Sequence, residues 1–210
     1  LIPDLLNDTF LEKKILGKKY DIFLRKASEF NKLTDKFLSK IDGVMTGHHV
    51  IFDNKKIEKL INCKVIVRYG VGFDSVDIKQ AGYQNIKVFN IPDYGVDEVA
   101  DHALAMILNL SRFINGNDEI LKKEYKENEI KWLYDQNKNQ KRLKDLSLGI
   151  IGLGRIGTAL AERSKSIFKN ILFYDPLKED GYDKALGIKK EEKLINLFKN
   201  SDVISLHAPS

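Results

Sequence analysis

The stretch LGIIGLGRIGTAL, residues 148–160, constrains the fold of this chain more than any other segment. A short apolar run is interrupted by three glycines and then continues in a pattern typical of a helix. At a strand–turn–helix junction, the first glycine permits a tight turn and the second lets the backbone approach a pyrophosphate. The third lets the helix lie close to the strand, so that the first helical N–H groups face the anion. We therefore predict a dinucleotide-binding loop made of Gly152, Leu153, Gly154, Arg155, Ile156 and Gly157.

Asp175 strengthens this prediction, because it ends the next expected strand in ILFYDP. A carboxylate at that position accepts hydrogen bonds from the hydroxyls of the adenosine ribose. It would repel the additional phosphate of NADP, and Lys178 is the only cation nearby in the sequence. The pattern therefore favours NAD over NADP. The alternative interpretation is a glycine-rich turn followed by an aspartate that begins the next loop, with no ligand.

Strand-like and helix-like segments alternate along the chain, which predicts an α/β fold with doubly wound parallel sheets. In the first part, strands are expected at residues 1–2, 20–24, 43–45, 64–67 and 86–90, and helices at 10–16, 33–39, 55–61 and 76–81. From residue 147 onward, strands are expected at 148–151, 171–174 and 203–206, and helices at 155–168 and 191–198.

A long helix is expected between these two parts, from Asp97 to Ile114. It is apolar on most of its circumference, so it should be buried on more than one side, between domains or subunits. The boundary between two α/β units is expected near residues 93–100. The lysine-rich stretch at 117–146 is expected to form helix and loop on the surface.

The composition is that of an ordinary globular protein of 210 residues, with 43% hydrophobic and 31% charged residues. No apolar run approaches the roughly 18 residues of a membrane span, and no signal-peptide pattern is present at the start. The net charge is +5, but the lysines alternate with acidic residues, which is typical of solvated helix faces rather than of a nucleic-acid surface. We therefore expect no nucleic-acid partner, no membrane partner and no metal.

Cys63 is the only cysteine, which excludes an internal disulfide framework. A lone cysteine fits a reducing, cytoplasmic setting. The sequence indicates no basic partner for a catalytic thiol, so we expect Cys63 to be a buried structural residue.

Five stretches together resemble the D-isomer-specific 2-hydroxyacid dehydrogenases in order and spacing. They are RYGVGFDSVDIKQAG (68–82), VADHALAMILNLSR (99–112), LGIIGLGRIG, FYDP and DVISLHAP (202–209). Within that family, ADHALAMILNLSR and ILFYDP are most similar to the branch that contains the C-terminal-binding-protein corepressors. The resemblance implies a flavodoxin-like substrate domain at residues 1–97 and an NAD-binding Rossmann domain at 98–210. It also implies a homodimer, with the long helix at the dimer interface.

The resemblance further implies that Gly70, Val71 and Gly72 offer backbone N–H groups to the carboxylate of the substrate. Two glycines around one residue suit this role because the backbone itself must reach the anion. A simple turn between strand and helix is compatible with the same residues. The segment His207, Ala208 and Pro209 corresponds to the family's segment at the end of the third strand of the nucleotide domain, where it lines the cofactor.

Three other histidines have less defined roles. His48 and His49 follow an expected strand, where they face either the cleft or the solvent as a surface pair. His102 lies on the long helix and is expected to make a polar contact there.

The family's catalytic arginine, glutamate and histidine all follow the HAP segment, and this sequence stops at Ser210. No catalytic residue is therefore predicted within this chain. Because the sequence lacks a starting methionine and its second sheet is expected to end at the third strand, we expect a truncated nucleotide domain and an incomplete polypeptide.

The leading hypothesis is an NAD-dependent oxidoreductase that interconverts a D-2-hydroxy acid and its 2-keto acid by hydride transfer. One alternative is an NAD(H)-sensing dimeric binding protein of the corepressor type, without turnover. Another is a truncated, inactive paralogue. Lactate-like, glycerate-like and phosphorylated substrates all remain open, as does the physiological direction of the reaction.

Overall fold

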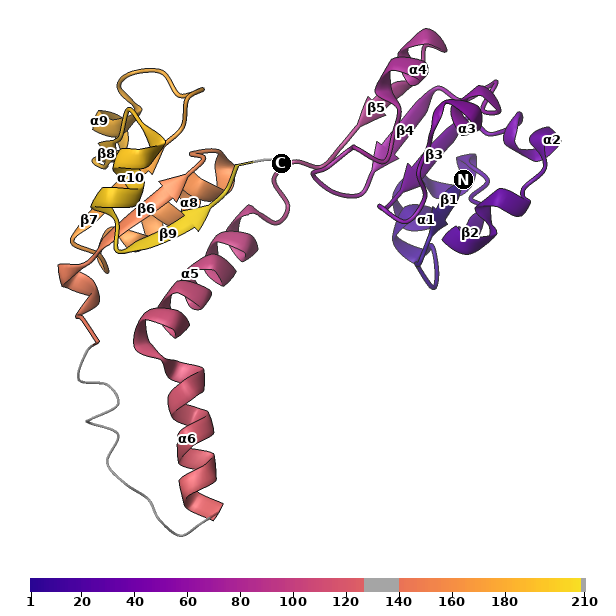
Figure 1. The fold of residues 1–210 in the computed structure, drawn as a ribbon. Coiled ribbons are helices and arrows are strands. Elements are labelled where there is room, and N and C mark those ends of the chain that lie inside the picture. Colours follow the sequence, from indigo (N-terminus) through magenta and orange to yellow (C-terminus); the bar gives the residue numbers. More distant parts are fainter. Residues whose placement is uncertain (127–139, 209–210) are drawn as a thin grey trace. The chain divides into compact units, whose positions relative to one another are not determined.

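The structure, a computed structural model, describes residues 1–126 and 140–208 (Figure 1). The chain divides into two compact units, Leu1–Tyr94 and Gly95–Ser210. Each unit contains parallel β-strands and its own buried core, so each is described by itself. The α/β class with parallel sheets, predicted from the alternation of segments, is confirmed.

The first unit has five parallel strands. Strand β1 pairs with β2, and β4 pairs with both β3 and β5. The Met45 N–H donates to the Leu1 carbonyl oxygen at 3.0 Å and joins the two groups of strands. The resulting order 2-1-3-4-5 is that of flavodoxin-like folds, as the resemblance implied. The strands are β1 Ile2–Asp4, β2 Leu24–Lys26, β3 Gly43–Thr46, β4 Val65–Arg68 and β5 Lys87–Phe89.

Short helices connect these strands, and three of them begin at a side-chain cap. The oxygens of Thr34, Asp53 and Asp77 accept hydrogen bonds from N–H groups in the first helical turn, which otherwise lack partners. The helices are α1 Phe10–Leu16, α2 Asp35–Leu38, α3 Asn54–Glu58 and α4 Ile78–Tyr83, with 3-10 turns η1 Gly17–Lys19 and η2 Ala27–Lys32.

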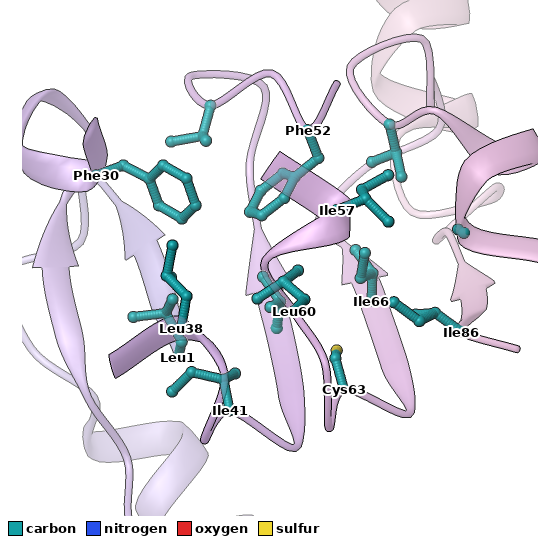
Figure 2. Close-up of a cluster of buried hydrophobic side chains, with 14 residues drawn as sticks. Leu1, Phe30, Leu38, Ile41, Phe52, Ile57, Leu60, Cys63, Ile66 and Ile86 are labelled. Carbon is teal, nitrogen blue, oxygen red and sulfur yellow. The ribbon is translucent and has the colours of Figure 1, made fainter. Parts of the chain in front are cut away.

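The core of the first unit lies between its strands and helices (Figure 2). Phe52 is fully buried, and its ring meets that of Phe30 edge to face at a centroid distance of 5.1 Å. Cys63 is buried in the same core, and its thiol donates to the Val65 carbonyl oxygen at 3.3 Å. Burial raises the pKa of this thiol, so the expectation of a buried structural cysteine is confirmed.

The second unit has a four-stranded parallel sheet in the order β8-β7-β6-β9. Numbered within the unit, this order is 3-2-1-4, which is the arrangement of a Rossmann sheet. The first strand, β6, is central, and its carboxyl end continues into the glycine loop. The strands are β6 Ser147–Ile151, β7 Asn170–Tyr174, β8 Lys189–Lys190 and β9 Val203–Leu206.

Helix α5 packs against α8 in this unit through a face of small residues and Ile107. The Arg163 guanidinium on α8 donates to the carboxylates of Asp101 and Asp97 on α5, at 2.5 and 2.6 Å. No helix in the described ranges is long and apolar enough to cross a membrane. The helices are α5 Val96–Arg112, α6 Ile114–Lys126, α8 Arg155–Ser164, α9 Tyr182–Leu186 and α10 Leu194–Asn200, with the 3-10 turn η3 Leu143–Asp145.

Several expected elements are misplaced. The strand expected at 20–24 is wrong, because pairing with β1 aligns Leu24 with Ile2 and leaves Tyr20 55% exposed. The helix expected at 155–168 ends at Ser164, whose carbonyl oxygen accepts from two following N–H groups and closes a tighter turn. The long helix ends at Arg112, since Phe113 adopts a left-handed conformation before α6 begins.

The expectation that the second sheet ends at its third strand is also wrong. Strand β8 is two lysines long and lies at the sheet edge, so neither its length nor its polarity indicates a strand in the sequence. The segment that contains His207 therefore follows the fourth strand of this unit rather than the third.

We expect Phe52→Ala to lower the free energy of unfolding by about 3–5 kcal/mol, because it opens a cavity beside Phe30. Ile51→Ala is the matched control, since Ile51 is 61% exposed and its truncation should change stability by less than about 0.5 kcal/mol. Urea denaturation followed by circular dichroism measures both variants. Equal losses in the two variants would contradict the assignment of Phe52 to the core.

Candidate functional site

The glycine loop leaves the central strand β6 through a turn that only glycine suits. Gly152 has a φ of +88°, and its N–H donates to the Tyr174 carbonyl oxygen at 2.9 Å. A Cβ at this position would lie 2.7 Å from the Ala208 nitrogen and 2.8 Å from the His207 carbonyl carbon. The backbone of the segment after β9 therefore presses directly against the turn, and the predicted role of Gly152 has a steric basis.

The other two glycines of the loop have opposite surroundings. A Cβ on Gly157 would overlap the carbonyl oxygen of Gly152, so this glycine lets α8 begin close to the strand. A Cβ on Gly154, which precedes the first residue of α8, would meet no protein atom within 4 Å. The space beside Gly154 is thus open toward a ligand rather than filled by the fold.

Asp175 connects the end of β7 to the glycine loop. One carboxylate oxygen accepts from the Leu153 N–H at 2.8 Å, and the other accepts from the Leu177 N–H at 2.9 Å. The Leu153 side chain is fully buried in the core, which anchors the glycine loop to the rest of the unit. Each carboxylate oxygen can accept a second hydrogen bond, so Asp175 retains acceptor capacity for a ligand hydroxyl.

Helix α8 begins directly after Gly154, and its first N–H groups lack partners within the helix. Arg155 is exposed, and Ile156 packs partly against the core of the unit. This arrangement presents backbone donors and the positive end of a helix dipole to an anion.

His207 lies at the same edge of the sheet, just after β9. Its backbone N–H donates to the Ile151 carbonyl oxygen at 2.7 Å, and its ring Nε2 lies 2.8 Å from the Ser205 hydroxyl oxygen. Burial lowers the pKa of this imidazole, which favours the neutral form of the ring. Ala208 is exposed beside the glycine turn, whereas Pro209 lies outside the described residues.

In the first unit, Gly70, Val71 and Gly72 follow β4 as a loop in which Gly70 is buried, whereas Val71 and Gly72 are exposed. Gly70 has a φ of +151°, and its carbonyl oxygen accepts from the Ile91 N–H at 2.9 Å. The side-chain amide of Asn90 donates a hydrogen bond to the Val71 carbonyl oxygen at 2.7 Å. Within the described ranges, the N–H groups of Val71 and Gly72 have no protein acceptor, which leaves two backbone donors for an anion.

Arg68 is a residue at this loop to which sequence reasoning assigned no role. Its guanidinium lies over Gly70, where a Cβ would overlap Nη1, and donates to the Tyr69 carbonyl oxygen at 2.6 Å. Its Nε is buried without a partner in the described part of the chain. The only sequence signal was a basic residue two positions before the first glycine.

The remaining histidines are surface residues. His48 and His49 follow β3, both are exposed, and their rings lie 3.9 Å apart between centroids. His102 is exposed on α5. Among the residues that the structure describes, no group of three His, Cys, Asp or Glu side chains is placed to hold a metal ion.

The sequence model of the family described as "D-isomer specific 2-hydroxyacid dehydrogenase, catalytic domain" matches residues 7–186. The match covers most of the chain and extends across both units. The chain therefore belongs to the D-isomer specific 2-hydroxyacid dehydrogenase family.

Two curated relatives illustrate its range. The chain is 30% identical over 200 residues to C-terminal-binding protein 1 of Caenorhabditis elegans, covering 95% of this chain and 28% of that protein. It is 33% identical over 200 residues to the glyoxylate reductase of Thermococcus litoralis, covering 93% of this chain and 60% of that protein. The chain thus spans less than two thirds of the length of either relative.

A solved structure is similar over the whole chain. It is the D-lactate dehydrogenase of Aquifex aeolicus complexed with NAD and lactic acid, which is 26% identical with a TM-score of 0.81. The match covers 100% of this chain and 60% of that one. The similarity in sequence and in fold agrees with the family assignment.

We expect Gly157→Ala to destabilise the chain by about 1–3 kcal/mol, because its methyl group would overlap the Gly152 carbonyl oxygen. Gly154→Ala is the matched control in the same loop. It has open space and an ordinary φ of −73°, so stability should stay within about 0.5 kcal/mol. Thermal and urea unfolding measure both variants, and the steric account fails if Gly154→Ala is the more destabilised.

Proposed function

We propose that this chain functions in an NAD-dependent oxidoreductase that interconverts a D-2-hydroxy acid and its 2-keto acid by hydride transfer. The observation that supports this most directly is the hydrogen bond between the Leu153 N–H and the Asp175 carboxylate beside the open space at Gly154. Together these features offer a site for the pyrophosphate and the ribose of a dinucleotide.

The residues fit NAD. Gly152, Leu153, Gly154, Arg155, Ile156 and Gly157 would hold the pyrophosphate against the N-terminus of α8, and Asp175 would accept from the ribose hydroxyls. His207, with Ala208 and Pro209, would line the cofactor after β9. When bound, NAD supplies the hydride acceptor, and the chain's own residues bind and orient it.

The loop of Gly70, Val71 and Gly72 in the first unit is the proposed binding site for the substrate carboxylate. The N–H groups of Val71 and Gly72 would donate to the carboxylate, with Gly70 providing the turn. The Arg68 guanidinium adds a positive charge over the loop. In this assignment residues 1–97 are the substrate domain and residues 98–210 are the nucleotide domain.

We further propose a homodimer formed through α5. Val99, Met106 and Leu110 on this helix are 46%, 50% and 77% exposed, which is unusual for a helix that also packs on a core. A cytoplasmic location is consistent with the single buried thiol of Cys63.

A second candidate is an NAD(H)-sensing dimeric binding protein without turnover. The 30% identity to C-terminal-binding protein 1 over 95% of this chain favours it. Both candidates predict NADH binding, so turnover separates them.

The test combines binding and turnover. This chain should bind NADH, measured by fluorescence titration, and the full natural chain should oxidise NADH with at least one member of a panel of 2-keto acids. Binding without turnover across the panel would favour the sensing protein or an inactive paralogue. Absence of NADH binding would refute both NAD-dependent proposals.

We expect Asp175→Asn to shift cofactor preference toward NADPH, because it removes the charge that would repel the additional phosphate. The ratio of the Kd for NADPH to that for NADH should fall by roughly tenfold or more. Asp183 lies in the following helix, α9. Asp183→Asn also removes one carboxylate charge, and it should leave the ratio unchanged. Titrations of both cofactors test this, and an unchanged ratio in Asp175→Asn would exclude Asp175 as the discriminating residue.

A further inference from the structure

The segment after Asp175 forms a loop, residues 176–181, between β7 and α9, and we call it the post-β7 loop. Asp175 holds the first residues of this loop by two hydrogen bonds. Its carboxylate accepts from the Leu177 N–H, and its backbone carbonyl oxygen accepts from the Lys178 N–H at 3.4 Å. Leu177 is 90% exposed, and its backbone N–H is hydrogen-bonded to the Asp175 carboxylate, the proposed ribose-binding group. The loop therefore presents an apolar side chain beside the proposed ribose site.

The far half of the post-β7 loop is held by Lys190, which comes from the edge strand β8. Its Nζ donates to the Asp180 carboxylate at 2.9 Å and to the Lys178 carbonyl oxygen at 3.4 Å. The Lys190 side chain is only 18% exposed, although Lys190 is in a two-residue edge strand. Most of the Lys190 side chain is thus shielded from solvent.

The neighbours of Lys190 in the sequence are bound elsewhere. The Lys189 ammonium donates to the buried Glu191 carboxylate at 2.7 Å, and Glu191 also accepts from Asn200 at the end of α10. Successive side chains in a strand point to opposite faces of the sheet. Lys190 is therefore the one of these three residues that is bonded to the post-β7 loop.

We propose that Lys190 is a positioning residue that holds the post-β7 loop in the conformation that receives the adenosine half of the cofactor. The inference rests on the proposed function, since it assumes that Asp175 binds the adenosine ribose. Lys190 acts through the loop and does not itself contact the cofactor. A loop already fixed in its binding conformation loses less entropy when the ligand binds.

A role in stability alone is a weaker account of these contacts. The Asp180 side chain is 97% exposed, and ion pairs with so exposed a partner contribute little to folding. Removing the ammonium should therefore change the conformation of the loop but have little effect on the free energy of unfolding. This difference separates a positioning role from a structural one.

The test compares Lys190→Met with Lys189→Met in this chain. The two variants remove one ammonium each from adjacent positions of the same strand. Lys189→Met breaks the ion pair with Glu191, and Lys190→Met breaks the pair with Asp180 and a longer one with Glu192. Two probes are titrated: NADH, and reduced nicotinamide mononucleotide, which lacks the adenosine half. We expect Lys190→Met to raise the Kd for NADH roughly 3- to 10-fold and to leave the Kd for the mononucleotide unchanged. Lys189→Met should change neither.

Two further variants keep the test decisive if Lys190→Met folds poorly. Asp180→Ala removes the exposed partner from the loop side and should raise the Kd for NADH in the same direction. Lys190→Arg retains a cationic donor and should restore binding toward that of the unsubstituted chain.

Each outcome has a distinct meaning. If the unsubstituted chain binds NADH and Lys190→Met or Asp180→Ala binds it equally well, this inference is wrong while the proposed function stands. Equal weakening of NADH and the mononucleotide would also overturn it, because the effect would not be confined to the adenosine half. If the unsubstituted chain does not bind NADH, the proposed function fails and this inference fails with it.

Discussion

The hydrogen bond from the Leu153 N–H to the Asp175 carboxylate is the contact on which the candidate site in the second unit depends. It joins the carboxyl ends of β6 and β7, so the glycine loop and the Asp175 carboxylate form one structure. The Ile151 carbonyl oxygen makes a corresponding bond to the His207 N–H and brings in the end of β9. Because parallel strands end at one edge, three segments distant in sequence converge there, joined by the Asp175 carboxylate and by the backbone bond from His207 to Ile151. The chemistry of the site thus follows from the pairing of the strands.

Much of this arrangement was predictable from the sequence, because its elements have strong local signals. The apolar run before Gly152 and the helical pattern after Gly157 define β6 and α8 without knowledge of the rest of the chain. The α1 helix was also placed correctly at residues 10–16, and in the structure Gly17 directly follows its last residue. Asp175 was identified because a carboxylate follows a strand at the spacing expected of a ribose-binding residue. The family assignment rests on the order of such signals.

The remaining features could not be predicted because they depend on partners distant in sequence. Strand β8 consists of Lys189 and Lys190, which become a strand only because the edge of β7 offers backbone groups to pair with. The position of β2 is set by its register with β1 rather than by the apolar residues that precede it. The placement of the Arg68 guanidinium over Gly70 and the bond from Lys190 to the post-β7 loop are likewise side-chain conformations with no local pattern.

The burial of Cys63 has a practical consequence for studying this chain in solution. Its thiol is 2% exposed and its pKa is raised, so little reactive thiolate is accessible at neutral pH. A cysteine introduced at an exposed position such as Leu177 should therefore react with a maleimide dye in preference to Cys63. A single fluorophore can then be attached beside Asp175 without first replacing the native thiol. Its fluorescence would report on events at this edge of the sheet.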